Sequence, residues 1–187
     1  METKNKLYEE ALAVMQAADC IHDQAAVEQA LDDMAAAITA DLADKNPLVI
    51  TVMNGGMLPA SLLLTRLPFP LKIDYLQATR YGEERTTGNE LVWQRSPGQS
   101  LAGRHVLIVD DILDEGYTLD AIIQYCEAQQ PLRVYSAVLA QKDHDRGIRP
   151  AISYVGLTVP DRYVFGCGMD YKGYWRNRLA IYAVAKR

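Results

Sequence analysis

The segment 106–119 constrains the fold of this chain more than any other stretch. It starts with a short apolar run, Val106-Leu107-Ile108-Val109, which suits a buried strand and is followed directly by two aspartates. A third aspartate, a glycine and a threonine come next, and the apolar spacing then turns helical. Because free backbone N–H groups at a helix N-terminus attract anions, a strand, a tight turn and a helix in this order predict a phosphate-binding turn. Three aspartates beside such a turn indicate a phosphorylated sugar, with hydroxyl groups to bind and a Mg²⁺ ion to share.

The composition is that of one globular domain spanning residues 1–187. Hydrophobic residues make up 49% of the chain, enough for a proper core, and the formal net charge of −5 argues against a nucleic-acid-binding surface. The three cysteines show no metal-ligand spacing, so the simplest interpretation is reduced thiols in a cytoplasmic protein. We expect no export signal, because the N-terminus leads into a helical pattern and not into an apolar signal core. We expect no membrane contact, because two prolines and an arginine interrupt the apolar stretch 58–71.

Strands and helices alternate along the middle of the chain, which predicts an α/β fold. Short apolar or alternating runs predict strands over 48–53, 71–77, 91–95, 105–109, 133–141, 153–158 and 163–165. Apolar residues at helical spacing predict helices over 7–20, 58–66 and 117–129, and another that begins after an Asp23 N-cap and stops before Asn46-Pro47. This alternation favours a central, mostly parallel sheet with right-handed crossovers, whose ligands bind at the carboxyl ends of the strands.

The segment 79–90 differs from its surroundings in composition. It is polar, charged and interrupted by glycines, and it lacks apolar side chains that would pack in a core. Loops of this length in compact domains are usually either functional or disordered, so we expect a long mobile loop here.

The acidic segment resembles the phosphoribosyl-diphosphate motif of the type I phosphoribosyltransferases. In that motif a buried strand leads into two acidic residues, two apolar residues, Asp, a small residue, Gly, any residue and Thr. Further matches follow the order seen in hypoxanthine-guanine phosphoribosyltransferases: Met53-Asn54-Gly55-Gly56, Arg80-Tyr81, Lys142, Val159-Pro160-Asp161-Arg162-Tyr163-Val164, Asp170-Tyr171 and Arg176. The resemblance covers about 48–182 and implies the fold of this family, with N-terminal helices (1–46) and a base-binding hood and tail (150–187).

The resemblance implies an enzyme of purine salvage that joins hypoxanthine or guanine to the ribose 5-phosphate of phosphoribosyl diphosphate, with Mg²⁺ as cofactor. Asp110 and Asp111 are then expected beneath the ribose hydroxyls and close to the metal. Asp114 is the expected general base, although an aspartate here is equally apt as a helix N-cap. The backbone of the next four residues is expected to wrap the 5′-phosphate: Glu115, Gly116, Tyr117 and Thr118.

Two positions in these loops depart from the family pattern. Glu115 stands where the family usually has Thr or Ser, so we expect its side chain to point outward and only its N–H to contact phosphate. Asn54 stands where many relatives have Lys or Arg, so pyrophosphate binding by Asn54 and Gly55 is expected to depend on backbone donors, the metal and Arg176. A plain Asn-Gly turn is the alternative for this segment.

The remaining matches imply a purine site. Lys142 is expected to donate to the 6-oxygen of the base, Tyr163 to stack on it, and the Val164 backbone to bond its edge. Asp170 is expected beside the base and linked to the metal, as a third carboxylate. A solvated lysine and an ordinary strand tyrosine are the alternatives, and His144 is expected to face solvent.

Arg80 and Tyr81, in the polar segment, are expected to close over the site and exclude water. Homodimers or homotetramers are what the family implies. Two other functions remain open at this point: a relative that prefers xanthine, and a regulator that keeps the nucleotide pocket without catalysis.

Overall fold

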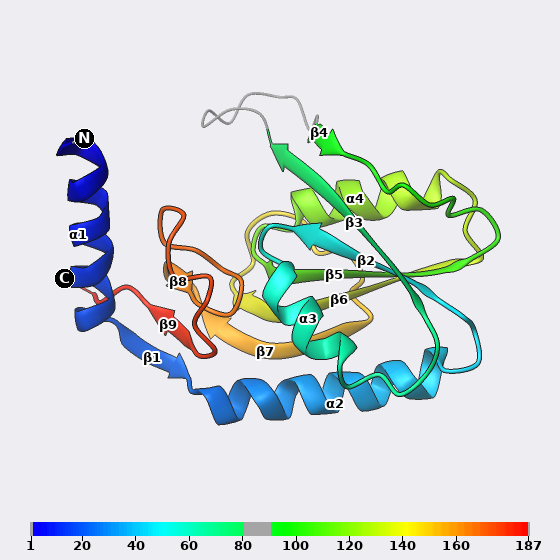
Figure 1. Ribbon diagram of the computed structural model, residues 1–187, viewed down its shortest axis with the longest axis horizontal. Helices are drawn as coiled ribbons and strands as arrows, with labels where there is room; N and C mark the ends of the chain where they lie inside the picture. The colour runs from blue at the N-terminus through cyan, green and yellow to red at the C-terminus, as the bar shows by residue number, and fades with distance from the viewer. Residues whose placement is uncertain (1, 81–90, 187) are drawn as a thin grey trace.

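The structure, a computed structural model, describes residues 2–80 and 91–186 (Figure 1). Its main sheet has six strands in the order β4-β3-β2-β5-β6-β7, and all neighbours are parallel except the edge pair of β3 and β4. The strands are β2 (Leu48–Met53), β3 (Lys72–Arg80), β4 (Leu91–Arg95), β5 (His105–Leu113), β6 (Arg133–Asp143) and β7 (Tyr154–Pro160). The prediction of a mostly parallel α/β sheet is confirmed.

Strand β5 is longer than predicted. Its pairing with β6 continues beyond residue 109, with Asp110 opposite Val138 and Leu113 opposite Gln141. Asp110 and Asp111 therefore belong to the end of the strand and do not follow it. The aspartates broke the apolar run in the sequence, but the backbone pairing with β6 did not depend on their side chains.

Helices cover both faces of this sheet, and alternate strand residues face each one. Helices α2 (Gln24–Leu42) and α3 (Met57–Leu64) pack against a core that includes Val49, Leu107 and Val109. Helix α4 (Tyr117–Glu127) packs on the opposite face, against Ile50 and Ile108. The predicted cap of α2 is confirmed, because the Asp23 side chain accepts a hydrogen bond of 2.9 Å from the Ala26 N–H.

A second, antiparallel sheet is built from both ends of the chain, in the order β1-β9-β8. Its strands are β1 (Asp19–His22), β8 (Val164–Phe165) and β9 (Ile181–Ala183), and α1 (Glu2–Ala17) packs beside them near the C-terminus (Figure 1). Strands β1 and β9 were not predicted, and the helix expected over 7–20 ends before β1. The expected hood boundary at residue 150 does not separate the sheets, since β7 belongs to the main one.

The N-terminal segment thus has two structural roles. Helix α2 covers one face of the main sheet, and β1 completes the small sheet. Within the described parts of the chain, no helix is both long and apolar enough to cross a membrane.

Candidate active site

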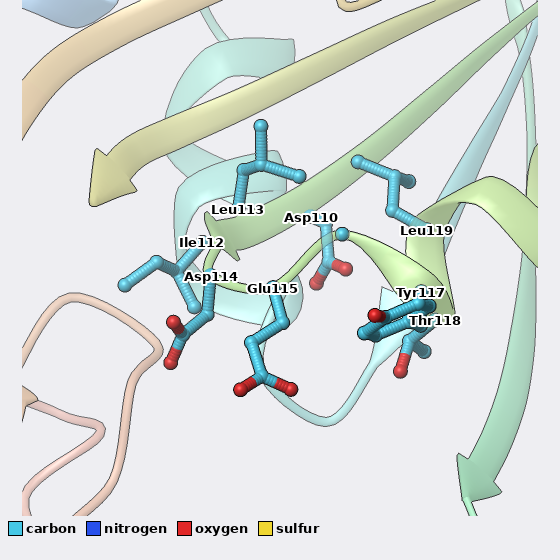
Figure 2. Close-up of a pocket in the computed structure, with 9 residues that line it drawn as sticks. Asp110, Ile112, Leu113, Asp114, Glu115, Tyr117, Thr118 and Leu119 are labelled. Atoms are coloured by element: carbon cyan, nitrogen blue, oxygen red, sulfur yellow. The ribbon is translucent and has the colours of Figure 1, made fainter. Parts of the chain in front are cut away.

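The turn between β5 and α4 encloses a cavity of about 340 Å³, called here the first cavity. Residues 114–118, the phosphate turn, form much of its wall. Helix α4 begins after Gly116, whose φ of +83° lies in the left-handed region that favours glycine. Figure 2 shows Asp114, Glu115 and Thr118 pointing to one side of the turn, and Leu113 and Leu119 to the other. The turn therefore places polar side chains and the N-terminus of α4 around one space.

Asp110 and Asp111 lie at the end of β5 and are largely removed from water. Asp110 is 9% exposed, and its Oδ1 accepts a hydrogen bond of 2.9 Å from the Asp111 N–H. Burial, and then the negative charge of Asp111, raise the pKa of Asp110 well above its ordinary value. Burial likewise raises the pKa of Asp111, although Asp110 and Arg176 act in the opposite direction. The pair is costly to keep ionised without a nearby cation or hydroxyl donors.

The loop after β2 lies against this pair. A side chain on Gly55 would overlap the Asp111 carboxylate, so only glycine leaves room for both groups. The preceding peptide bond, Met53-Asn54, is cis. Asn54 is exposed on the same loop. This loop therefore lies directly beside the acidic pair, and its assignment to pyrophosphate stays a prediction.

A second cavity, of about 260 Å³, adjoins the first and shares Ile112 and Asp114 with it. Its lining brings together the residues that the sequence analysis assigned to a purine site: Lys142, Tyr163, Val164 and Asp170. Asp111 and Met169 complete the wall. Tyr163 is 51% exposed, so its ring is open to contact with a ligand. These side chains come from β5, β6, β8 and the loops on either side of β8, and those segments are far apart in the sequence.

Lys142 and Asp114 form an ion pair between the two cavities. The Lys142 Nζ donates to Asp114 Oδ2 over 2.7 Å, and only 13% of the lysine side chain is exposed. Lys142 is therefore not the solvated lysine of the alternative interpretation.

Asp114 also has a partner that the sequence analysis missed. The His144 Nε2 lies 2.8 Å from Asp114 Oδ1, and the His144 side chain is only 4% exposed. The expectation that His144 faces solvent is wrong, because the chain after β6 folds back onto the phosphate turn. Partial burial acts to raise the pKa of Asp114, but the hydrogen bonds from Lys142 and His144 outweigh it and lower that pKa. Asp114 does not cap α4, since the N-cap residue is Gly116.

Arg176 and Asp170 are joined across the loop that follows β8. The Arg176 guanidinium lies 2.5 Å from Asp170 Oδ1 and 3.9 Å from Asp111 Oδ2. It also donates to the Gly168 carbonyl at 2.6 Å, while the second Asp170 oxygen accepts from the Gly173 N–H. Both Asp170 oxygens are thus engaged, and Arg176 brings positive charge to the acidic pair.

The Glu115 side chain differs from its prediction, and most of the predicted loop 79–90 lies outside the described residues. Glu115 lines the first cavity and points to the same side of the turn as Asp114 (Figure 2), so its side chain is not turned away as expected. Arg80 ends β3, whereas Tyr81 and most of the segment 79–90 lie outside the described residues.

The donor set suits a hard cation. Carboxylate oxygens are the ligands that Mg²⁺ prefers, and a cation beside Asp110 and Asp111 would offset their mutual repulsion. Across residues 2–80 and 91–186, no three acidic, histidine or cysteine side chains are grouped closely enough to hold a metal. Oxygens of a bound ligand would therefore have to complete the coordination.

Comparisons with known proteins agree with this geometry. Residues 17–172 match the family model described as "Phosphoribosyl transferase domain". The chain is 31% identical over 162 residues to the hypoxanthine-guanine-xanthine phosphoribosyltransferase of Tritrichomonas foetus, covering 86% of this chain and 88% of the relative. It is 28% identical to the hypoxanthine-guanine phosphoribosyltransferase of Streptococcus pneumoniae, covering 83% and 86%.

A solved structure of a hypoxanthine-guanine-xanthine phosphoribosyltransferase superimposes with a TM-score of 0.82 at 27% identity. The match covers 90% of this chain and 97% of that one. The similarity therefore extends over nearly the whole chain.

Proposed function

This chain belongs to the phosphoribosyl transferase family, and from that membership we propose that it transfers the 5-phosphoribosyl group of phosphoribosyl diphosphate to hypoxanthine or guanine. The products are IMP or GMP and pyrophosphate, a reaction of purine salvage. One observation carries the assignment of the site: the two cavities meet at Asp114, and Lys142 reaches the same carboxylate from the second cavity.

In the reaction, the bond between ribose C1 and a pyrophosphate oxygen breaks, and a bond between C1 and N9 of the purine forms. Backbone N–H groups of the phosphate turn hold the 5′-phosphate at the start of α4. Asp110 and Asp111 accept hydrogen bonds from the ribose hydroxyls. Holding the sugar and the base in line in this way can supply about 7–11 kcal/mol of the barrier.

Asp114 takes the proton that the purine imidazole ring loses. Its lowered pKa keeps the carboxylate ionised at neutral pH, so it can accept that proton or stabilise the positive charge that develops on the ring. Arg176 adds positive charge near Asp111, on the side from which pyrophosphate departs. Asn54 and Gly55 contribute backbone groups on that side.

Asp110 and Asp111, with Asp170 nearby, are the residues that would hold Mg²⁺ together with substrate oxygens. The ion supplies charge stabilisation for the diphosphate. Arg80 and Tyr81 would close over the bound substrates and exclude water, which otherwise attacks the activated sugar.

The second cavity discriminates among purines. The Lys142 ammonium is a donor only, so it pairs with the 6-oxygen of hypoxanthine or guanine and not with the 6-amino group of adenine. With adenine, the Lys142 ammonium faces a second donor, so Lys142 gains no hydrogen bond from the base and keeps its pairing with Asp114, which disfavours adenine. Xanthine stays a second candidate substrate, because the Tritrichomonas foetus relative is named for all three bases.

Purified protein incubated with phosphoribosyl diphosphate, Mg²⁺ and each of four purines tests this proposal. We expect turnover of hypoxanthine and guanine, with adenine inert and xanthine ranked by its kcat/KM. Absence of turnover with all three 6-oxopurines would contradict the proposal, and nucleotide binding without turnover would favour a regulator. Light scattering of the same sample tests for the homodimer or homotetramer that the family suggests.

A further inference from the structure

We propose that His144 is a positioning residue that, held by Arg149, fixes the orientation of the general base Asp114. This inference rests on the proposed function, since it assigns a role to a neighbour of the base. His144 does not reach the substrate side of either cavity and acts only through the carboxylate.

The hydrogen bonds of His144 define its tautomer. Its Nδ1 lies 3.2 Å from the Arg146 backbone N–H and 2.9 Å from the Arg149 guanidinium, which are both donors. Nδ1 must therefore present a lone pair, and the ring proton is on Nε2. The Nε2–H then donates to Asp114 Oδ1 over 2.8 Å. A neutral imidazole of this tautomer holds the carboxylate without competing for its proton.

The segment 144–150 is anchored to the phosphate turn at several points besides His144. The Arg149 guanidinium donates to the Asp114 carbonyl at 2.5 Å and to the His144 carbonyl. The Ile148 N–H donates to the Glu115 carbonyl at 2.9 Å, and the Ile148 carbonyl lies where a side chain on Gly116 would be. The base is on a loop, and this segment gives that loop a rigid support.

The two oxygens of Asp114 have different partners, and this division explains why a second donor is useful. Oδ2 accepts from Lys142 and Oδ1 from His144. When Lys142 turns to the 6-oxygen of a bound purine, Oδ2 becomes available to the proton of the base. His144 keeps Oδ1 in place, so the carboxylate does not rotate when its first partner leaves. A misplacement of about 1 Å at a reacting group can reduce the rate about 100-fold.

Three substitutions separate positioning from simple packing. His144→Ala removes the hydrogen bonds of both ring nitrogens. His144→Gln keeps an N–H donor near the position of Nε2, and His144→Asn is too short to reach Asp114. We expect His144→Ala to lower kcat about 10- to 100-fold, with KM for phosphoribosyl diphosphate changed less than about 2-fold. His144→Gln is expected to recover most of kcat and His144→Asn little of it. His22→Ala, a histidine that bonds the Thr158 carbonyl far from the turn, is the matched control.

A double-substitution cycle with Asp114→Asn completes the test, because a residue that acts through Asp114 has no further effect once the base is gone. If His144→Ala does not fold, the comparison of the Gln and Asn variants decides. Provided that the unmodified chain turns over, any one of three results would overturn this inference and leave the proposed function intact. These results are an undiminished kcat in His144→Ala, additive losses in the cycle, and an equal kcat in the Gln and Asn variants. Absence of turnover by the unmodified chain would instead overturn the proposed function, and this inference with it.

Discussion

Lys142 and Asp114 are joined by a hydrogen bond of 2.7 Å across the boundary between the two cavities. Lys142, which we assign to the 6-oxygen of the purine, is thus held by Asp114, which we assign to the proton of the purine imidazole ring. Each lowers the cost of keeping the other charged in a partly buried place. Binding of a 6-oxopurine exchanges one acceptor for another on Lys142, so the ammonium is paired before and after binding.

Lys142→Met removes the donor to the 6-oxygen and keeps the length of the side chain. A hydrogen bond from a charged group contributes about 1.5–3 kcal/mol, so KM for hypoxanthine is expected to rise about 10- to 100-fold. The ratio of kcat/KM for hypoxanthine to kcat/KM for adenine should fall by a similar factor. Steady-state kinetics with both bases measure this, and Lys45→Met, at the surface, is the control. An unchanged ratio of hypoxanthine to adenine would exclude Lys142 as the determinant.

Asp114→Asn keeps the shape of the side chain and removes its ability to take a proton. We expect kcat to fall about 10²- to 10⁴-fold, the usual contribution of general acid–base catalysis. The Kd for IMP should change only a few-fold, because the phosphate turn keeps its backbone. Kinetics and calorimetry on the same preparation test this. Equal losses in turnover and binding would indicate a structural role.

Glu115→Thr removes a negative charge from the wall of the first cavity. A like-charge repulsion of about 1 kcal/mol near the surface corresponds to about a 5-fold lower KM for phosphoribosyl diphosphate in the variant. The difference should shrink at high ionic strength, since salt screens exposed charges. Glu127→Thr, at the far end of α4, should show neither effect. A KM that does not depend on residue 115 would mean that the carboxylate turns away when substrate binds.

Asp110→Asn is expected to stabilise the ligand-free protein while abolishing most of its activity. The amide oxygen can keep the hydrogen bond from the Asp111 N–H, and the repulsion between two buried carboxylates disappears. Each kcal/mol regained raises Tm by about 2–4 °C in a protein of this size. Thermal unfolding without Mg²⁺ or nucleotide measures it, with Asp120→Asn on α4 as control. A lower Tm in the variant would contradict our account of the acidic pair.

Asp74→Asn tests a carboxylate away from the site. One Asp74 oxygen accepts from the Gly98 and Gln99 N–H groups, each at 2.8 Å, and the other from the Tyr75 N–H at 2.8 Å. An amide cannot accept on both sides, so a buried donor loses its partner and the free energy of unfolding falls by about 1–3 kcal/mol.

The pH dependence of that loss has a definite sign. Burial acts to raise the pKa of Asp74, but its hydrogen bonds outweigh burial and lower the pKa below the ordinary value of 3.8. The stabilisation is therefore complete above about pH 4 and is lost as the pH falls through the lower, folded-state pKa. The difference in Tm between the unmodified protein and Asp74→Asn should therefore become smaller in that acid range. A Tm difference that grows in that range would contradict this assignment. As the control, Asp44→Asn at an exposed position should have the same Tm as the unmodified protein.

Local sequence pattern predicted those parts of the fold whose structure depends on residues close by in the sequence. The apolar run before Asp110, the turn at Gly116 and the spacing of helix α2 can all be recognised in a window of a dozen residues. The predicted strands at 48–53 and 91–95 match β2 and β4. The residues around the second cavity were assigned in a different way, through the order of motifs in a known family, because local pattern alone favours ordinary surface or strand residues there.

The sequence by itself therefore determined the alternating α/β order, the acidic strand end and the turn that follows it, since backbone and side-chain preferences act over short distances along the chain. Only the tertiary structure decided that His144 is buried against Asp114, that Arg176 joins Asp170 to Asp111, and that β1 pairs with β9. Those contacts join segments that are distant in the sequence. Their partners are selected by how the sheets and loops pack, and no local pattern carries that information.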